Sequence, residues 1–192
     1  MPTHPLARSL SPLTLALIVL AASAAPVAAQ DPYGPLSKWS AVGSAGAMDD
    51  SSVGLLTIEG AAAWFRTTAP AQSIGVLRFP IDRITSYVCV NGSCGNYPKL
   101  TMNLTFVKND EQAYVSAVIY KVNPTNGAVS SYRAVNTLDA PAGLGGQSVS
   151  RTFTCSSPCF DPAFIHFVEV VLWKPLATSA PKLIALSIQQ GF

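Results

Sequence analysis

The chain has 192 residues, of which 49% are hydrophobic and only 11% are charged, and its formal net charge is +2. Such a weak charge provides no basic stripe that could neutralise a phosphate backbone, so we expect no nucleic-acid partner. No run of Lys and Arg indicates docking on an anionic membrane either.

Residues 1–29 have the pattern of a secretory signal peptide. Arg8 supplies a positive charge, residues 13–20 (LTLALIVL) form a short apolar stretch, and Val27-Ala28-Ala29 fits a signal-peptidase site before Gln30. The apolar stretch is shorter than the about 20 residues of a transmembrane helix, although an uncleaved anchor helix is the alternative. We therefore expect a cleaved signal peptide, a secreted or periplasmic location, and no membrane insertion after cleavage.

Removing residues 1–29 from the 192-residue chain leaves 163, enough for one domain with its own core. Residues 30–47 are rich in Pro, Gly, Ser and Ala and predict a flexible lead-in, with Trp39 packed against the body of the protein. Residues 48–192 are expected to form a single domain, because no repeat, composition change or linker divides them.

From there the dominant hydrophobic period is two, which indicates strands and not helices. Residues 53–65 and 74–81 look extended, and Met102, Leu104 and Phe106 alternate with polar residues. Further strands are predicted at 114–122, 129–137, 149–154, 164–173 and 184–189, separated by a hairpin turn at 123–127 and by loops at 139–147 and 175–181. Roughly eight short strands predict an all-β fold, a single antiparallel β-sandwich with Greek-key or jelly-roll-like connections; a closed barrel is the alternative.

One predicted strand, residues 164–173 (FIHFVEVVLW), is apolar on both faces. A sandwich strand normally exposes one face to solvent. The second face, with Phe167 and Trp173, is therefore covered by a loop, by the lead-in with Trp39 or by a partner, or it is an aromatic platform for a ligand. Burial in the structure distinguishes these alternatives.

The four cysteines of an exported chain are expected to be oxidised, and four cysteines allow three pairings. Their spacing favours the local disulfides Cys89–Cys94 and Cys155–Cys159 over a zinc site. In CVNGSC, an Asn-Gly hairpin turn places Cys89 opposite Cys94 as a non-hydrogen-bonded pair. Such a pair is close enough for a disulfide.

No pattern of residues indicates catalysis. After signal cleavage His166 is the only histidine, within an apolar strand, and no Gly-x-Ser-x-Gly motif accompanies it. Glu59 and Glu169 are the best pair of carboxylates for glycosidic chemistry, but nothing in the sequence places them together. We expect no catalytic residues and no cofactor, with a structural calcium ion kept open and no other metal.

The segments TTAPAQSIGVLRFPI (67–81), KLTMNLTFV (99–107) and LIALSIQQ (183–190), behind an exported leader, resemble a loose group of small secreted bacterial β-sandwich proteins whose own functions are not established. Phe79 stands where that group has a strand-end cysteine before proline. The resemblance implies an exported β-sandwich and carries no catalytic or binding motif.

The leading hypothesis is a non-enzymatic, secreted ligand-binding β-sandwich with carbohydrate as the favoured ligand, since sugar rings stack on aromatic side chains. The candidate ligand-binding residues are the aromatics Trp64, Tyr97, Tyr132, Phe167 and Trp173. The alternative is an extracellular structural or assembly protein whose apolar sheet face packs on another extracellular protein. A hydrolase is the third hypothesis.

Overall fold

The computed structural model describes residues 38–81, 87–90, 93–96, 99–155 and 158–191, and for 87–90 and 93–96 it describes the backbone alone. The predicted signal peptide, residues 30–37 of the lead-in and Tyr97 lie outside the described residues. Within these ranges no helix has both the length and the apolar character needed to cross a membrane.

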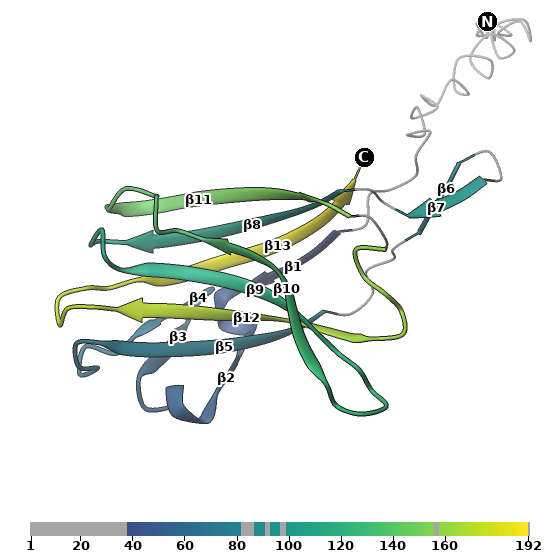
Figure 1. The fold of residues 1–192 in the computed structure, drawn as a ribbon. Helices are drawn as coiled ribbons and strands as arrows, with labels where there is room; N and C mark the ends of the chain where they lie inside the picture. The colour runs from purple at the N-terminus through teal and green to yellow at the C-terminus, as the bar shows by residue number, and fades with distance from the viewer. Residues whose placement is uncertain (1–37, 82–86, 91–92, 97–98, 156–157, 192) are drawn as a thin grey trace, which may run out of the picture. The chain divides into compact units, whose positions relative to one another are not determined.

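Two antiparallel sheets form the domain (Figure 1). The six-stranded sheet has the order β11 (Gly143–Thr154), β8 (Lys99–Lys108), β13 (Lys182–Gly191), β4 (Ala62–Phe65), β3 (Leu56–Glu59), with β1 (Lys38–Val42) also paired to β13. The five-stranded sheet has the order β10 (Val129–Asn136), β9 (Tyr114–Val122), β12 (Ile165–Lys174), β5 (Ser73–Ile81), β2 (Ala47–Met48). Two short 3-10 helices, η2 (Gly43–Ala45) and η3 (Asp50–Ser52), and the hairpin of β6 (Tyr87–Val90) and β7 (Ser93–Asn96) complete the described elements.

The connections between the long strands are those of a jelly roll. Strands β9 and β10 form a hairpin within one sheet, and β8 and β11, on either side of that hairpin in the sequence, pair in the other sheet. Next, β12 pairs with β9 and β5, and β13 pairs with β8 and β4. The prediction of a single antiparallel β-sandwich is thus confirmed, and of the two predicted connection types the structure has the jelly roll. The two sheets together hold eleven of the described strands, more than the roughly eight that were predicted, because the short strands β1 to β4 add to the long ones.

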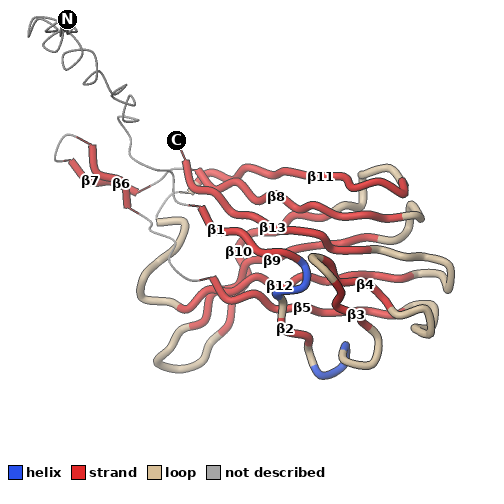
Figure 2. Tube along the Cα trace, turned by 180° about the vertical axis from the view of Figure 1, so that it is seen from behind, coloured by secondary structure: helices blue, strands red, loops and turns tan. Residues whose placement is uncertain are grey.

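The core lies between the two sheets because alternate residues of each long strand point inward. In β12 the residues Val168, Val170 and Leu172 are fully buried, and in β8 the same holds for Leu104 and Phe106. Figure 2 shows the strands from behind, with both sheets running in similar directions. This regular alternation leaves two outer faces, one on each sheet.

The described part of the expected lead-in, residues 38–47, contains β1, η2 and the start of β2. Trp39 pairs with Ile188 in the β1–β13 register, and its ring meets the ring of Phe79 edge to face at 6.5 Å. The ring is partly buried and packs against the core from the inner side of its sheet. The expectation that Trp39 covers the outer face of β12 is therefore wrong.

Two predicted segments differ from the structure. Residues 53–65, expected to be extended, contain the β3–β4 hairpin, which turns at Gly60 with φ +58°. Residues 139–147, expected to be a loop, include the start of β11, whose pairing with β8 shifts between Gly143 and Gln147. A β-bulge in this edge strand accommodates the glycines, which form regular strands poorly.

The predicted hairpin register of CVNGSC is confirmed in the backbone. Strands β6 and β7 pair Cys89 with Cys94 and Val90 with Ser93. The side chains of these residues are outside the described part, so the Cys89–Cys94 disulfide stays a prediction. The second predicted disulfide, Cys155–Cys159, is formed, with its two Cα atoms 5.5 Å apart.

Candidate functional site

The outer face of the five-stranded sheet carries two cross-strand pairs of partly exposed aromatic residues. Trp173 of β12 lies opposite Tyr114 of β9, and Phe167 lies opposite Tyr120. The rings of Tyr120 and Phe167 stack nearly parallel, with centroids 5.2 Å apart. We call the surface formed by Tyr114, Tyr120, Phe167 and Trp173, together with Arg78 and Glu169 between the two pairs, the aromatic face.

Charged groups occupy the centre of the aromatic face. Arg78 of β5 donates a hydrogen bond from Nε to Glu169 Oε2 at 3.0 Å, and its Nη1 lies 2.8 Å from Asp49 Oδ2. The bond to Glu169 raises the pKa of Arg78, and bonds from the Ser51 hydroxyl and backbone N–H lower the pKa of Asp49. Arg78 and Asp49 are therefore charged at neutral pH, and the contacts of Arg78 hold the three side chains together beside the rings.

The aromatic face is elongated along β12. Phe167 and Trp173 are six residues apart on one strand, which corresponds to about 20 Å at the usual rise of a strand. Glu169 and Val171 lie between them on the same face. The surface therefore offers flat apolar rings at its two ends and hydrogen-bonding groups in the middle.

The other predicted ligand-binding residues lie elsewhere. Trp64 is on β4, on the outer face of the six-stranded sheet, where the ammonium group of Lys182 lies 4.5 Å from its ring centroid. Tyr132 is half-buried on β10, and Tyr97 is outside the described residues. Of the five predicted residues, the structure brings Phe167 and Trp173 together and separates Trp64 and Tyr132 from them.

Tyr132 lines a cavity at one end of the sandwich because β10 contains a bulge. In the β9–β10 pairing, Ser131 lies opposite Tyr120 and Arg133 lies opposite Ile119, so Tyr132 is an extra residue. Ile119 is fully buried, which places Arg133 on the inner side of its sheet. Tyr132 also points inward, since its ring contacts the ring of the buried His166 edge to face at 6.1 Å.

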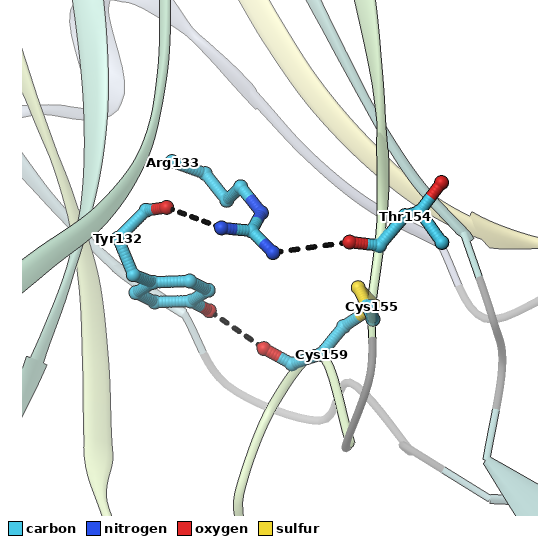
Figure 3. Close-up of a disulfide and its surroundings, with 5 residues drawn as sticks. All are labelled: Tyr132, Arg133, Thr154, Cys155 and Cys159. Atoms are coloured by element: carbon cyan, nitrogen blue, oxygen red, sulfur yellow. Dashed lines mark hydrogen bonds between the residues drawn. A yellow bond between two sulfur atoms is a disulfide. The ribbon is translucent and has the colours of Figure 1, made fainter.

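Backbone carbonyls hold the side chains of this bulge (Figure 3). Arg133 donates from Nη1 to the Tyr132 carbonyl at 2.7 Å and from Nη2 to the Thr154 carbonyl at 3.1 Å. The Tyr132 hydroxyl donates to the carbonyl of Cys159 at 2.8 Å, next to the disulfide with Cys155. The disulfide therefore fixes the chain segment that anchors the tyrosine.

The cavity has a volume of about 230 Å³. We call it the end pocket; it is lined by Lys121, Tyr132, Arg133, Asp161 and His166 and by the Cys155–Cys159 disulfide. Burial lowers the pKa of His166, and the charge of Lys121 acts in the same direction while Asp161 opposes it. The imidazole is therefore neutral at pH 7, which leaves two cations and one carboxylate around the pocket.

A second hollow lies on the outer face of the six-stranded sheet, with a volume of about 260 Å³. Small side chains of β1, β8 and β13 line it, among them Ser40, Asn103 and Ser187. Asn103 Nδ2 donates to Ser187 Oγ at 3.3 Å, and Thr105 bonds to Ser148 across the β8–β11 pair. This face is hydroxyl-rich, in contrast to the aromatic face.

The structure does not bring together the residues considered for catalysis, Glu59, Glu169 and His166. Glu59 is on the six-stranded sheet and Glu169 is on the outer face of the five-stranded sheet. His166 is buried among the rings of Tyr132 and Phe160. Within the described ranges, no group of three or more His, Cys, Asp or Glu residues is arranged to hold a metal ion.

Sequence reasoning missed Tyr114, Tyr120 and Arg78 as parts of the aromatic face. The alternation in 114–122 did place both tyrosines on the outer side of their strand. Their position beside Phe167 and Trp173 depends on the pairing of β9 with β12, which the sequence does not reveal.

No protein-family model matches the sequence, and no curated protein matches it. Among solved structures, the chain is similar to a carbohydrate-binding module of the Cellvibrio mixtus lichenase 5A in complex with cellotriose, with 12% identity and a TM-score of 0.45 over 80% of this chain and 98% of that one. A module specific for non-crystalline cellulose, CBM28, gives 12% identity and a TM-score of 0.40 over 77% and 89%. A family 11 carbohydrate-binding module from Clostridium thermocellum, in complex with a β-1,3-1,4-mixed-linked tetrasaccharide, gives 11% and 0.37 over 82% and 91%.

Proposed function

We propose that this protein is a non-enzymatic carbohydrate-binding β-sandwich that holds a polysaccharide chain along the aromatic face. The observation that carries this proposal is the pairing of Trp173 with Tyr114 and of Phe167 with Tyr120 on one outer sheet face. These rings are partly exposed on strands whose inner residues are fully buried. Their exposure leaves them available to a ligand.

The chemistry of the face matches that of a sugar chain. The C–H groups of a pyranose ring form flat apolar patches that stack on aromatic rings, while its hydroxyls require hydrogen-bond partners. The rings of the aromatic face supply the first contact, and the carboxylate of Glu169 and the guanidinium of Arg78 supply the second. A binding site with mostly apolar walls and a few fixed polar groups is the usual composition of ligand sites in proteins.

Rigid strands support this role. Glu169 and Arg78 face each other in the β5–β12 register, and Asp49 holds Arg78 from a second direction. Groups that are fixed before binding lose little conformational freedom when the ligand arrives, which favours affinity. The Cys155–Cys159 disulfide fits an oxidising, extracytoplasmic location, where a polysaccharide ligand would be met.

Affinity gel electrophoresis with soluble neutral polysaccharides (a β-glucan, a xylan and a mannan) tests the proposal. We expect at least one of them to retard the protein and Trp173→Ala to abolish that retardation. Trp64→Ala is the matched control, because it removes a partly exposed tryptophan from the other sheet. Lack of retardation by every polysaccharide, or equal retardation of the Trp173→Ala variant, would contradict the proposal.

The second candidate is an assembly protein that uses the same face. Ile74 and Ile165 are 50% and 60% exposed on the outer side of β5 and β12, and large exposed aliphatic residues are typical of contact surfaces. This function predicts a concentration-dependent dimer in sedimentation, which Ile165→Lys dissociates. A monomer at all concentrations would exclude self-assembly through this face.

A further inference from the structure

We infer that the end pocket is a second binding site, separate from the aromatic face, and that it takes a monosaccharide-sized carboxylate such as a uronic acid. Its position supports a separate site. Tyr132 and His166 reach the pocket from the inner side of the five-stranded sheet, whereas the aromatic face is the outer side of that sheet. The carboxylate is inferred from the pocket alone, and only the choice of a sugar ring rests on the proposed function.

The charges around the pocket favour a monoanion. Lys121 and Arg133 contribute two positive charges, Asp161 contributes one negative charge, and His166 is neutral at pH 7. Among the described residues, neither Lys121 nor Arg133 has a carboxylate partner within 4.0 Å; the ion pairs found there are those of Arg78. One bound carboxylate would neutralise the net charge of +1 around the pocket. A dianionic phosphate would instead leave a net negative charge next to the carboxylate of Asp161.

The cationic groups are held in place before a ligand binds. Two carbonyls fix the guanidinium of Arg133, and the rings of Tyr132 and Phe153 lie 5.8 and 5.5 Å from its Cζ. Lys121 lies over the ring of Phe164 at 4.8 Å. A guanidinium has five N–H donors and only two are used by these carbonyls. The Nε donor is buried without an acceptor in the described part of the chain. The site is therefore rich in donors and short of acceptors.

The volume of the end pocket and its two other polar side chains, Asp161 and His166, favour a small acid that also carries hydroxyl groups. A volume of about 230 Å³ is below the roughly 300 Å³ at which pockets for drug-sized ligands begin. The carboxylate of Asp161 can accept a hydrogen bond from a hydroxyl, and the imidazole of His166 can accept or donate one. A sugar acid carries a carboxylate and hydroxyls on one small ring, so it satisfies both sets of groups.

Titration of the oxidised, 15N-labelled protein with glucuronate, observed by NMR and calorimetry, tests this inference. We expect the amide signals of the pocket residues to shift with glucuronate and at least about tenfold weaker binding of glucuronamide, which has the same ring without the charge. Titration with acetate, which has the carboxylate but no sugar ring, shows whether the pocket recognises a sugar acid or any small carboxylic acid. Weaker binding of acetate identifies a sugar acid, and equal binding shows a carboxylate site that takes free small acids, which supports the carboxylate and contradicts the sugar ring.

Lys121→Gln is the test variant, and Lys182→Gln is its control because it removes the same charge beside Trp64. We expect glucuronate affinity to fall about tenfold in the first variant and to stay unchanged in the second. An equal loss of glucuronate affinity in both variants, or no shift of the pocket signals in the unaltered protein, would overturn the inference.

The Trp173→Ala variant separates this inference from the proposed function. It should abolish polysaccharide binding and leave glucuronate binding intact, so the experiments can contradict one binding site without contradicting the other.

Discussion

Arg78 and Glu169 lie directly opposite each other on β5 and β12, and Arg78 Nε donates to Glu169 Oε2 over 3.0 Å. The arginine side chain is 49% exposed, so solvent screens this ion pair. Exposed pairs contribute about 0–1 kcal/mol to stability. Under the proposed function, this pair between two pairs of aromatic rings would hydrogen-bond the ligand and contribute little to folding.

Replacing this pair should therefore affect binding more than folding. We expect Arg78→Gln and Glu169→Gln each to lower the free energy of unfolding by less than about 1 kcal/mol. Both should weaken retardation by the polysaccharide that the unaltered protein binds. Urea denaturation and affinity electrophoresis on the same samples compare the two effects. A large stability loss with unchanged binding would assign the pair a structural role.

Phe167→Ala should reveal the length of the bound chain. The variant removes the ring stacked on Tyr120 and leaves Trp173, about 20 Å away along β12. We expect calorimetry to show weaker binding of long oligosaccharides and unchanged binding of short ones that reach only Trp173. Equal weakening for every length would mean that the ligand does not extend along the strand.

His166 should make stability depend on pH. Burial, the largest cause, lowers the pKa of His166 in the folded protein below its ordinary value of 6.5. The unfolded chain therefore takes up a proton first as the pH falls. The stabilising contribution of the neutral imidazole is present above pH 6.5 and is lost as the pH falls below that value. Denaturation midpoints measured between pH 8 and pH 5 should decline more steeply in the unaltered protein than in His166→Gln; parallel curves would contradict this expectation.

Peptide mapping by mass spectrometry without reduction should find Cys89 linked to Cys94 and Cys155 linked to Cys159. The backbone register already places the first two residues opposite each other. A Cys89–Cys155 peptide would contradict the predicted pairing.

Reduction should lower the stability of the protein modestly. The Cys155–Cys159 disulfide closes a short loop, and a loop of this size corresponds to about 2 kcal/mol in the chain-entropy model. Cys155→Ser in the unreduced state, compared with the unaltered protein by urea denaturation, measures this value. A loss above about 4 kcal/mol would show that the disulfide also supports packing, including the bond from Tyr132 to the Cys159 carbonyl.

The alternation of residues along each strand was the most reliable sequence signal, because side-chain direction in a strand is a local property. It placed Phe167 and Trp173 on one face and His166 on the other, as the structure does. It could not place Trp64 relative to them, since membership of a sheet depends on pairing between distant segments. The bulge at Tyr132 has no signature in the sequence, so the inward direction of that ring, and with it the end pocket, was not predicted.

The bulge has a consequence for how this fold can vary. Tyr132 is one residue too many for the ladder, and it lies in β10, the strand at the edge of its sheet. Because an edge strand has a partner on one side alone, an insertion or deletion at this point would change the contents of the pocket without requiring new partners for the other strands. In related chains, the length of this one strand would therefore report whether the pocket is present, even where the surrounding residues have diverged.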